Sequence, residues 1–108
     1  MKSACVYTII HASGAIETRP TEAAFDSDAM ADELHAIVGG TIEIVPHFDQ
    51  YKDKPAIVFC NEEGLLHDLP FNAAATALWI ANLARMDGAI RTPLHLVGDI
   101  VIVQDAEH

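Results

Sequence analysis

The sequence predicts an α+β protein with one mostly antiparallel sheet of five or six strands and two helices. Short runs of apolar and β-branched residues are interspersed with two segments of helical periodicity. The order of these segments mixes hairpins with helices, whereas a parallel α/β sheet would place a helix between successive strands. At 108 residues the chain can bury one modest core, so residues 1–108 are expected to form a single domain.

The strands are predicted from β-branched and aromatic runs bounded by turn residues. In order, they are expected over residues 5–11, 15–19, 41–45, 56–60, 65–67 and 94–103. Residues 41–45 fit the half-exposed centre of a sheet, while residues 56–60 are nearly all apolar and should be buried on both faces. The polar residues 47–54 predict an exposed loop, and residues 104–108 a solvated tail.

The first helix is expected over residues 28–38. Asp26 or Ser27 can accept a hydrogen bond from the first helical turn, as N-cap residues do. Gly39 follows the last periodic residue, where a helix commonly ends in a left-handed conformation.

The second helix is expected over residues 73–84, between the N-cap Asn72 and a stop at Gly88. It is preceded by a turn over residues 61–64, for which we expect a left-handed Gly64. Gly98 should mark a bend or bulge in the last strand.

The helix over residues 73–84 is apolar nearly all round, so more than one side of it should be buried. One sheet in so small a chain covers one side. The other side is therefore expected to bind a partner or a second copy, giving a homo-oligomer with a dimer favoured. The alternative is that residues 48–54 or the first hairpin cover it. The expected binding residues are Ala73, Ala77, Trp79, Ile80 and Ala81.

The charge is strongly acidic, with sixteen Asp and Glu against six Lys and Arg and a net charge of −10. Such a field repels nucleic acid and anionic membranes and attracts basic partners, so we expect no direct nucleic-acid or membrane binding. The acids keep an apolar-rich domain soluble, or they imitate a nucleic-acid backbone. Two cysteines within apolar runs and the lack of a signal-peptide pattern predict reduced thiols and a cytoplasmic location.

No stretch matches a catalytic, metal or phosphate-binding motif, so we predict no catalytic residues, no metal ligands and no cofactor. Histidines do not occur at H-x-x-x-H or H-x-H spacing. The candidate ligand-binding residues are two turn carboxylates and two bases near the end of the second helix. They are Glu62, Glu63, Arg85 and Arg91.

Four short motifs together resemble one family. In order, they are V-G-G-T-I-E-I-V at 38–45, N-E-E-G at 61–64, L-P-F-N at 69–72 with Ala75-Thr76, and V-G-D-I-V at 97–101. They resemble a family of small phage and bacterial proteins known as domain of unknown function DUF3846, over roughly residues 33–103. The resemblance implies a phage, prophage or bacterial accessory role and carries no catalytic residues over. The chain departs from the pattern in residues 48–54 and in its apolar second helix.

The preferred function is therefore a non-enzymatic acidic protein of a phage or mobile element that binds and modulates a host protein, with nucleic-acid mimicry as one mode. One alternative is sequestering of a nucleotide-like small molecule between subunits, using Arg85, Arg91, Lys52 and Lys54. A second alternative is a metal-assisted hydrolase using His67 and Asp68 with nearby carboxylates.

Overall fold

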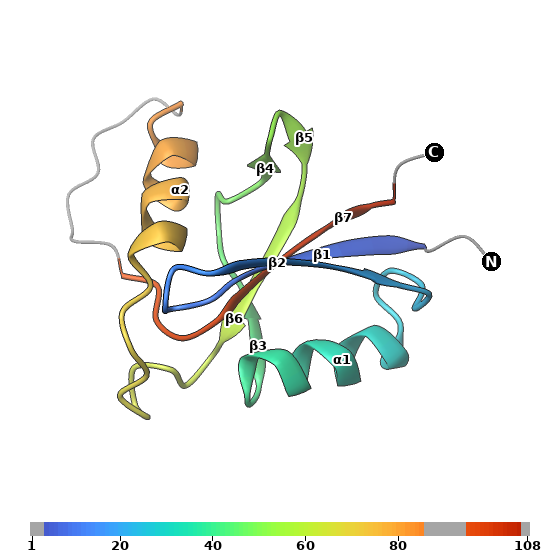
Figure 1. Ribbon diagram of the computed structural model, residues 1–108, viewed down its shortest axis with the longest axis horizontal. Coiled ribbons are helices and arrows are strands. Elements are labelled where there is room, and N and C mark those ends of the chain that lie inside the picture. Colours follow the sequence, from blue (N-terminus) through green and yellow to red (C-terminus); the bar gives the residue numbers. More distant parts are fainter. Residues whose placement is uncertain (1–3, 86–94, 107–108) are drawn as a thin grey trace.

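The predicted α+β class is confirmed by a computed structural model of the chain, which describes residues 4–85 and 95–106 (Figure 1). The elements are β1 (Cys5–Ile10), β2 (Ile16–Thr21), α1 (Asp28–Val38), β3 (Ile42–Ile44), β4 (Gln50–Tyr51), β5 (Lys54–Pro55), β6 (Ile57–Asn61), α2 (Ala73–Leu83) and β7 (Ile100–Asp105). Five strands form one sheet in the order β2-β1-β7-β6-β3, and every neighbouring pair is antiparallel. Strands β4 and β5 form a separate small hairpin.

Both ends of α1 follow from local sequence signals. The Ser27 hydroxyl accepts a hydrogen bond from the Met30 amide, and Gly39 ends the helix in the left-handed region at φ 82°. Ser27 is therefore the cap among the two candidates. The expected bounds of this helix, 28–38, are those observed.

The strand expected over residues 41–45 lies at the edge of the sheet, so its prediction as a central strand was wrong. Strand β3 pairs with β6 and is the last strand in the order. The centre is taken by β7, the last strand in the sequence, which lies between β1 and β6. The alternating pattern of residues 41–45 predicts a strand with one exposed face. A strand at the edge of the sheet fits this pattern as well as a central strand does.

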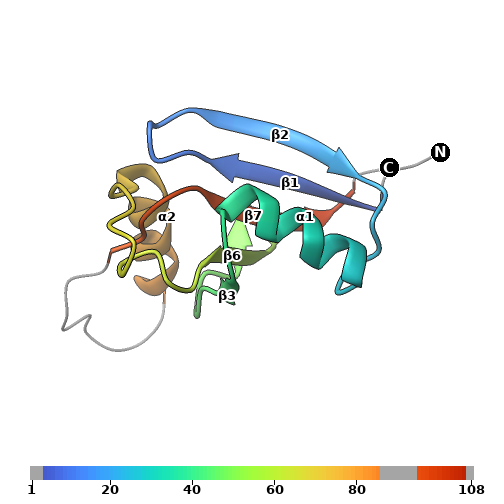
Figure 2. The ribbon, with the colours of Figure 1, turned by 90° about the horizontal axis from the view of Figure 1, so that it is seen from below.

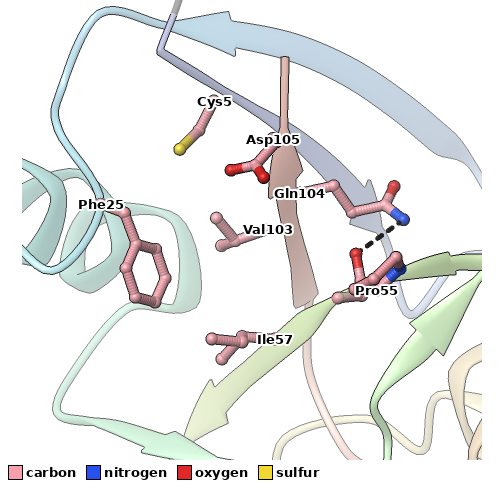
Figure 3. A pocket seen from close by; sticks show the side chains of 8 residues that line it. Cys5, Phe25, Pro55, Ile57, Val103, Gln104 and Asp105 are labelled. Atoms are coloured by element: carbon pink, nitrogen blue, oxygen red, sulfur yellow. Dashed lines mark hydrogen bonds between the residues drawn. The ribbon is translucent and has the colours of Figure 1, made fainter. Parts of the chain in front are cut away.

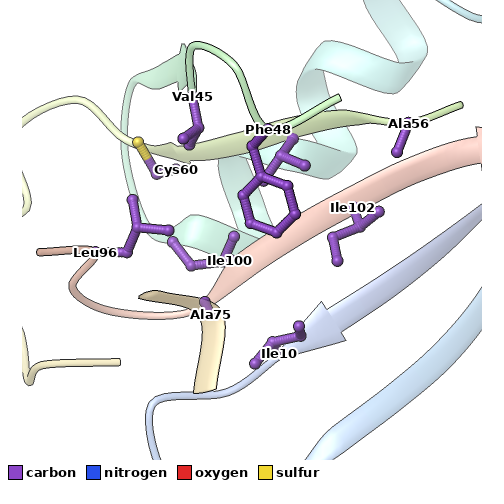
Figure 4. Packing of buried hydrophobic residues seen from close by; sticks show 10 residues of the cluster. Ile10, Val45, Phe48, Ala56, Cys60, Ala75, Leu96, Ile100 and Ile102 are labelled. Atoms are coloured by element: carbon purple, nitrogen blue, oxygen red, sulfur yellow. The ribbon is translucent and has the colours of Figure 1, made fainter. Parts of the chain in front are cut away.

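The polar stretch 47–54 is not simply an exposed loop. It contributes the β4 strand and the first residue of β5, and Phe48 is only 2% exposed. Phe48 packs with Val58 and Ile102 in the core, as Figure 4 shows for the surrounding cluster. The prediction failed because these contacts come from distant parts of the sequence, and the flanking charged residues gave no sign of them.

The segment after β6 forms hydrogen-bonded turns, so the strand predicted over residues 65–67 is absent from this described segment. The Gly64 amide donates to the Asn61 carbonyl at 3.1 Å, as a type I turn requires. Gly64 is not left-handed, however; Asp68 is, at φ 52°. Glycine is needed at position 64 for space, because a Cβ there would lie 2.8 Å from the Val97 side chain.

Helix α2 begins at the predicted cap. The Asn72 side chain accepts from the Ala75 amide, and the helix runs to Leu83. The predicted stop at Gly88 lies outside the described residues. Gly98 bends the chain at φ 72°, but it lies before β7 and not within it, because this strand begins at Ile100, later than predicted, and extends further than predicted, to Asp105. Gln104 and Asp105 belong to this strand, so the solvated tail was placed too early.

The sheet carries an apolar cluster on each face. Helix α1 covers one face, where Met30, Leu34 and Val38 pack against β1 and β7 (Figure 2). Helix α2 lies against the other face with Val45 and Phe48. Helix α2 lies toward one end of the sheet (Figure 1). A groove forms where α2 approaches the edge strand β3.

Candidate functional site

A small groove lies between α2, the edge strand β3 and the turn that follows β6. Its volume is about 130 Å³. It is lined by Glu43, Val45, Pro46, Cys60, Asn61, Glu62, Leu65, Trp79, His95, Leu96 and Val97. Segments that are far apart in the sequence therefore build one surface.

The floor of the groove is apolar and fixed in place. Val45, Cys60 and Leu96 are buried members of the core cluster beneath it. The Leu96 amide donates to the Thr76 hydroxyl at 2.9 Å, and its carbonyl accepts from the Asn72 amide at 2.7 Å. These two bonds hold the 95–97 segment against α2.

Trp79 forms the wall contributed by α2. Its indole is half-buried against the core, and its Nε1 donates to the Pro46 carbonyl at 2.8 Å. This bond orients the ring. A large aromatic side chain with a fixed orientation thus borders the groove.

Two carboxylates flank this apolar floor. Glu43 lies opposite Cys60 in the β3–β6 ladder, and the Glu62 amide extends that ladder by donating to the Thr41 carbonyl at 2.7 Å. Among the described residues, neither carboxylate has a hydrogen-bond or ion-pair partner. Burial, and then the negative charges of Glu43 and Glu62, raise the pKa of the Cys60 thiol to about 11. The thiol at the floor is therefore neutral at physiological pH.

The turn beside the groove displays apolar side chains. Leu65 is 71% exposed and Leu66 is 80% exposed. The turn is nevertheless ordered, because the His67 amide donates to the Glu63 carbonyl and the Leu69 amide to the Gly64 carbonyl, both at 3.1 Å. Leu65 reaches the groove, so the apolar surface continues outward from its floor.

The residues expected to form a partner face on α2 divide into two groups. Ala73, Ala77, Ile80 and Ala81 are exposed and lie together at helical spacing on the outer side of α2. Trp79 lies toward the core and the groove instead. The helix is thus covered on one side and open on the other.

The expected ligand-binding residues do not converge. Glu62 lines the groove, whereas Glu63 pairs with His67 at 3.7 Å outside it. Arg85 lines a different, open pocket of about 450 Å³ with Tyr51 and Lys52. Its guanidinium donates to Asn82 Oδ1 at 2.7 Å and lies 3.4 Å from Asp49 Oδ1. Arg91 lies outside the described residues.

A polar cluster on the α1 side of the sheet ties the first hairpin to the bend before β7. His11 Nδ1 lies 3.0 Å from Asp99, and Nε2 lies 3.1 Å from Glu17. Both contacts hold the pKa of His11 above its ordinary value, with Glu17 the larger cause. Hydrogen bonds from Arg19 and His11 lower the pKa of Glu17. The cluster is a charge-paired link with both imidazole nitrogens engaged.

A further pocket of about 190 Å³ lies at the opposite end of the sheet (Figure 3). Phe25 and Ile57 give it an apolar lining, with the carboxylate of Asp105 at one side. Cys5 points toward this space, and burial followed by the charge of Asp105 raises the pKa of its thiol. Both cysteines are free and buried, as the sequence predicted.

The part of the chain that the structure describes contains neither a metal-binding cluster nor a membrane-spanning helix. Within residues 4–85 and 95–106, no group of three His, Cys, Asp or Glu residues could hold a metal ion. The hydrolase alternative built on His67 and Asp68 gains no support from these residues. Neither described helix has the length and apolar character needed to span a membrane.

The fold and the groove define a small acidic α+β protein with an apolar groove lined by two carboxylates. The chain belongs to the family described as domain of unknown function DUF3846, whose pattern matches residues 8–108. The resemblance expected from the four motifs is thereby confirmed. No curated protein and no solved structure gave a significant match.

Of these lining residues, Glu62 and Trp79 were predicted as parts of two separate sites, and Glu43, His95 and Leu96 were not predicted. Glu43 stood out as the one charged residue in an apolar strand. Its position opposite Cys60 depends on the pairing of β3 with β6, which the sequence alone does not reveal. For His95 and Leu96, which approach α2 after a loop, the sequence held no local signal.

Proposed function

We propose that this chain is a non-enzymatic binding protein whose groove engages a basic partner protein. The observation on which this rests is the pair of carboxylates, Glu43 and Glu62, beside an apolar floor and without partners among the described residues. A surface of this kind complements an apolar segment that carries positive charge. The net charge of −10 adds long-range attraction toward such a partner.

The thiol at the floor of the groove supports binding over catalysis. The raised pKa of Cys60 keeps its sulfur in the poorly nucleophilic thiol form. The groove therefore offers contact surface and charge.

The proposal is tested by charge neutralisation at two matched places. The double variant Glu43→Gln/Glu62→Gln removes two carboxylates at the groove, and Glu22→Gln/Asp32→Asn removes two exposed ones elsewhere. Immobilised wild-type chain is expected to retain basic proteins from a bacterial lysate at low salt and to release them at high salt. The groove variant should lose them and the control should keep them. Equal retention by both variants would refute the proposal.

A phage or mobile-element origin, a bacterial host partner and a cytoplasmic location complete the proposal. They rest on the acidic charge and on the resemblance described above. If the acids imitate a nucleic-acid backbone, double-stranded DNA or RNA should displace the retained protein. Persistence of the complex in excess nucleic acid would reject mimicry while leaving protein binding intact.

The alternative function, sequestering of a nucleotide-like molecule, is favoured by the open pocket beside Tyr51, Lys52 and Arg85. Its volume of about 450 Å³ lies within the range of small-molecule sites, ~300–1,000 Å³. Arg85 and Lys52 would bind phosphate, and Tyr51 would stack on a base. A thermal-shift panel of nucleotides tests this, and a flat response across the panel rejects it.

A further inference from the structure

The size of the groove limits what can occupy it. At about 130 Å³ it is smaller than the ~300–1,000 Å³ of sites that hold cofactors and nucleotides. It has room for the end of one protein side chain. A macromolecular partner would therefore insert a single residue here and rest its neighbours on the surrounding surface.

The chemistry of the lining specifies that residue. Trp79 and Leu65 present apolar surface, and Glu43 and Glu62 supply negative charge that no described residue pairs. A side chain with an apolar stem and a positive end complements both the apolar walls and the negative charge of the groove. A cation near an indole also gains cation–π attraction. Aspartate and glutamate would be repelled, and a purely apolar side chain would leave both carboxylates unpaired.

We propose that the groove binds one lysine or arginine side chain of the partner, with its stem along Trp79 and its cation between Glu43 and Glu62. This inference rests on the proposed function and names the chemistry of its partner. The residues next to the inserted base are apolar, because Leu65 and Leu66 stand exposed at 71% and 80% beside the groove. The ordered turn that carries them is preformed for this contact.

Trp79 is the only tryptophan in the chain, so its fluorescence reports on the groove directly. The probe is the peptide acetyl-Ala-Leu-Lys-Leu-Ala-amide, and its controls carry acetyl-lysine or glutamate at the central position. We expect the lysine peptide to change the Trp79 emission in a saturable way, with a Kd on the order of 1 mM for so short a ligand. The two control peptides should give no saturable change.

The matched charge variants locate the binding. Glu43→Gln/Glu62→Gln should weaken the lysine peptide about tenfold, as expected for the loss of two exposed ion pairs. Glu22→Gln/Asp32→Asn should change it less than twofold. Leu65→Ala, at an exposed position that leaves the fold intact, should also weaken it. Far-UV circular dichroism verifies that each variant is folded.

The inference is overturned by equal responses to the lysine, acetyl-lysine and glutamate peptides, or by an affinity for the lysine peptide that the groove variant leaves unchanged. A lack of response to the lysine peptide likewise rejects it. In that case, the proposed function would still hold if the groove variant loses the retained lysate proteins while the control variant keeps them. Equal retention by the groove and control variants would reject both.

Discussion

Asn72 joins three parts of the molecule, and its replacement should be among the most destabilising changes in the chain. The residue is fully buried. Its Oδ1 accepts from the Ala75 amide and caps α2, while its Nδ2 donates to the Ile10 and Gly98 carbonyls, both at 2.8 Å. One amide side chain thus links α2, the end of β1 and the bend before β7.

The magnitude follows from these bonds. Asn72→Ala removes an N-cap, worth about 1 kcal/mol, and two hydrogen bonds to buried carbonyls, worth about 1–1.5 kcal/mol each. We expect a loss of about 3–4 kcal/mol. Ser27→Ala is the matched control, since among the described residues the Ser27 hydroxyl accepts only from the Met30 amide and its loss should cost about 1 kcal/mol. The loss expected for Asn72→Ala is large compared with a total free energy of unfolding of about 5–15 kcal/mol for a protein domain.

Asn72→Asp separates the two roles of this side chain. A carboxylate keeps the cap acceptor but removes both donors and brings negative charge against two carbonyl oxygens. We expect Asn72→Asp to be at least as unstable as Asn72→Ala in urea unfolding followed by Trp79 fluorescence. A stability for Asn72→Asp within about 0.5 kcal/mol of wild type would show that only the cap matters, and the reasoning would be refuted.

Three further predictions concern pH, thiol chemistry and assembly. Because the folded-state pKa of His11 is raised above its unfolded value of 6.5, its contribution to stability is present below that pH. It should be lost as the pH rises through the folded pKa, and His11→Gln should flatten this fall in the urea midpoint. With a pKa of about 11 against 9.0, the thiolate population of Cys60 at pH 8 is about 100-fold below that of a free thiol, and burial slows reaction further. Mass spectrometry after iodoacetamide treatment should find Cys60 unmodified in the native chain, and rapid native alkylation would contradict this. If the outer face of α2 joins two copies, Ile80→Glu should convert a dimer to a monomer in sedimentation, whereas a monomeric wild type would reject that assembly.

The features that were predictable from the sequence are those set by neighbouring residues. The glycine stop at Gly39 and the cap at Asn72 were predicted, and Ser27 was one of two predicted caps, because all three depend on hydrogen bonds within a few positions. Burial of Phe48 depends instead on its contacts with β6 and β7, which the charged residues around it conceal. Residues 65–67 have strand-like composition but form turns.

The groove was harder to predict than the elements that build it. Glu62 and Trp79 were singled out for different reasons, one as a turn acid and the other as part of an apolar helix. Their proximity depends on the order of the strands and on the approach of residues 95–97 to α2. Which side of α2 stays exposed was only partly predictable. The other side is covered by Pro46 and Leu96, which are distant from α2 in the sequence.

The central position of β7 has a consequence for how the chain acquires its fold. The β1–β2 hairpin and the β3–β6 pair are separate until residues 100–105 are inserted between them. During synthesis, each part therefore exposes a strand edge and apolar surface until residues 100–105 emerge from the ribosome. Folding is expected to be slow and to follow synthesis of this segment, because its pairing with β1 spans most of the sequence. Truncation before Ile100 should therefore yield an aggregating chain in place of a smaller folded one.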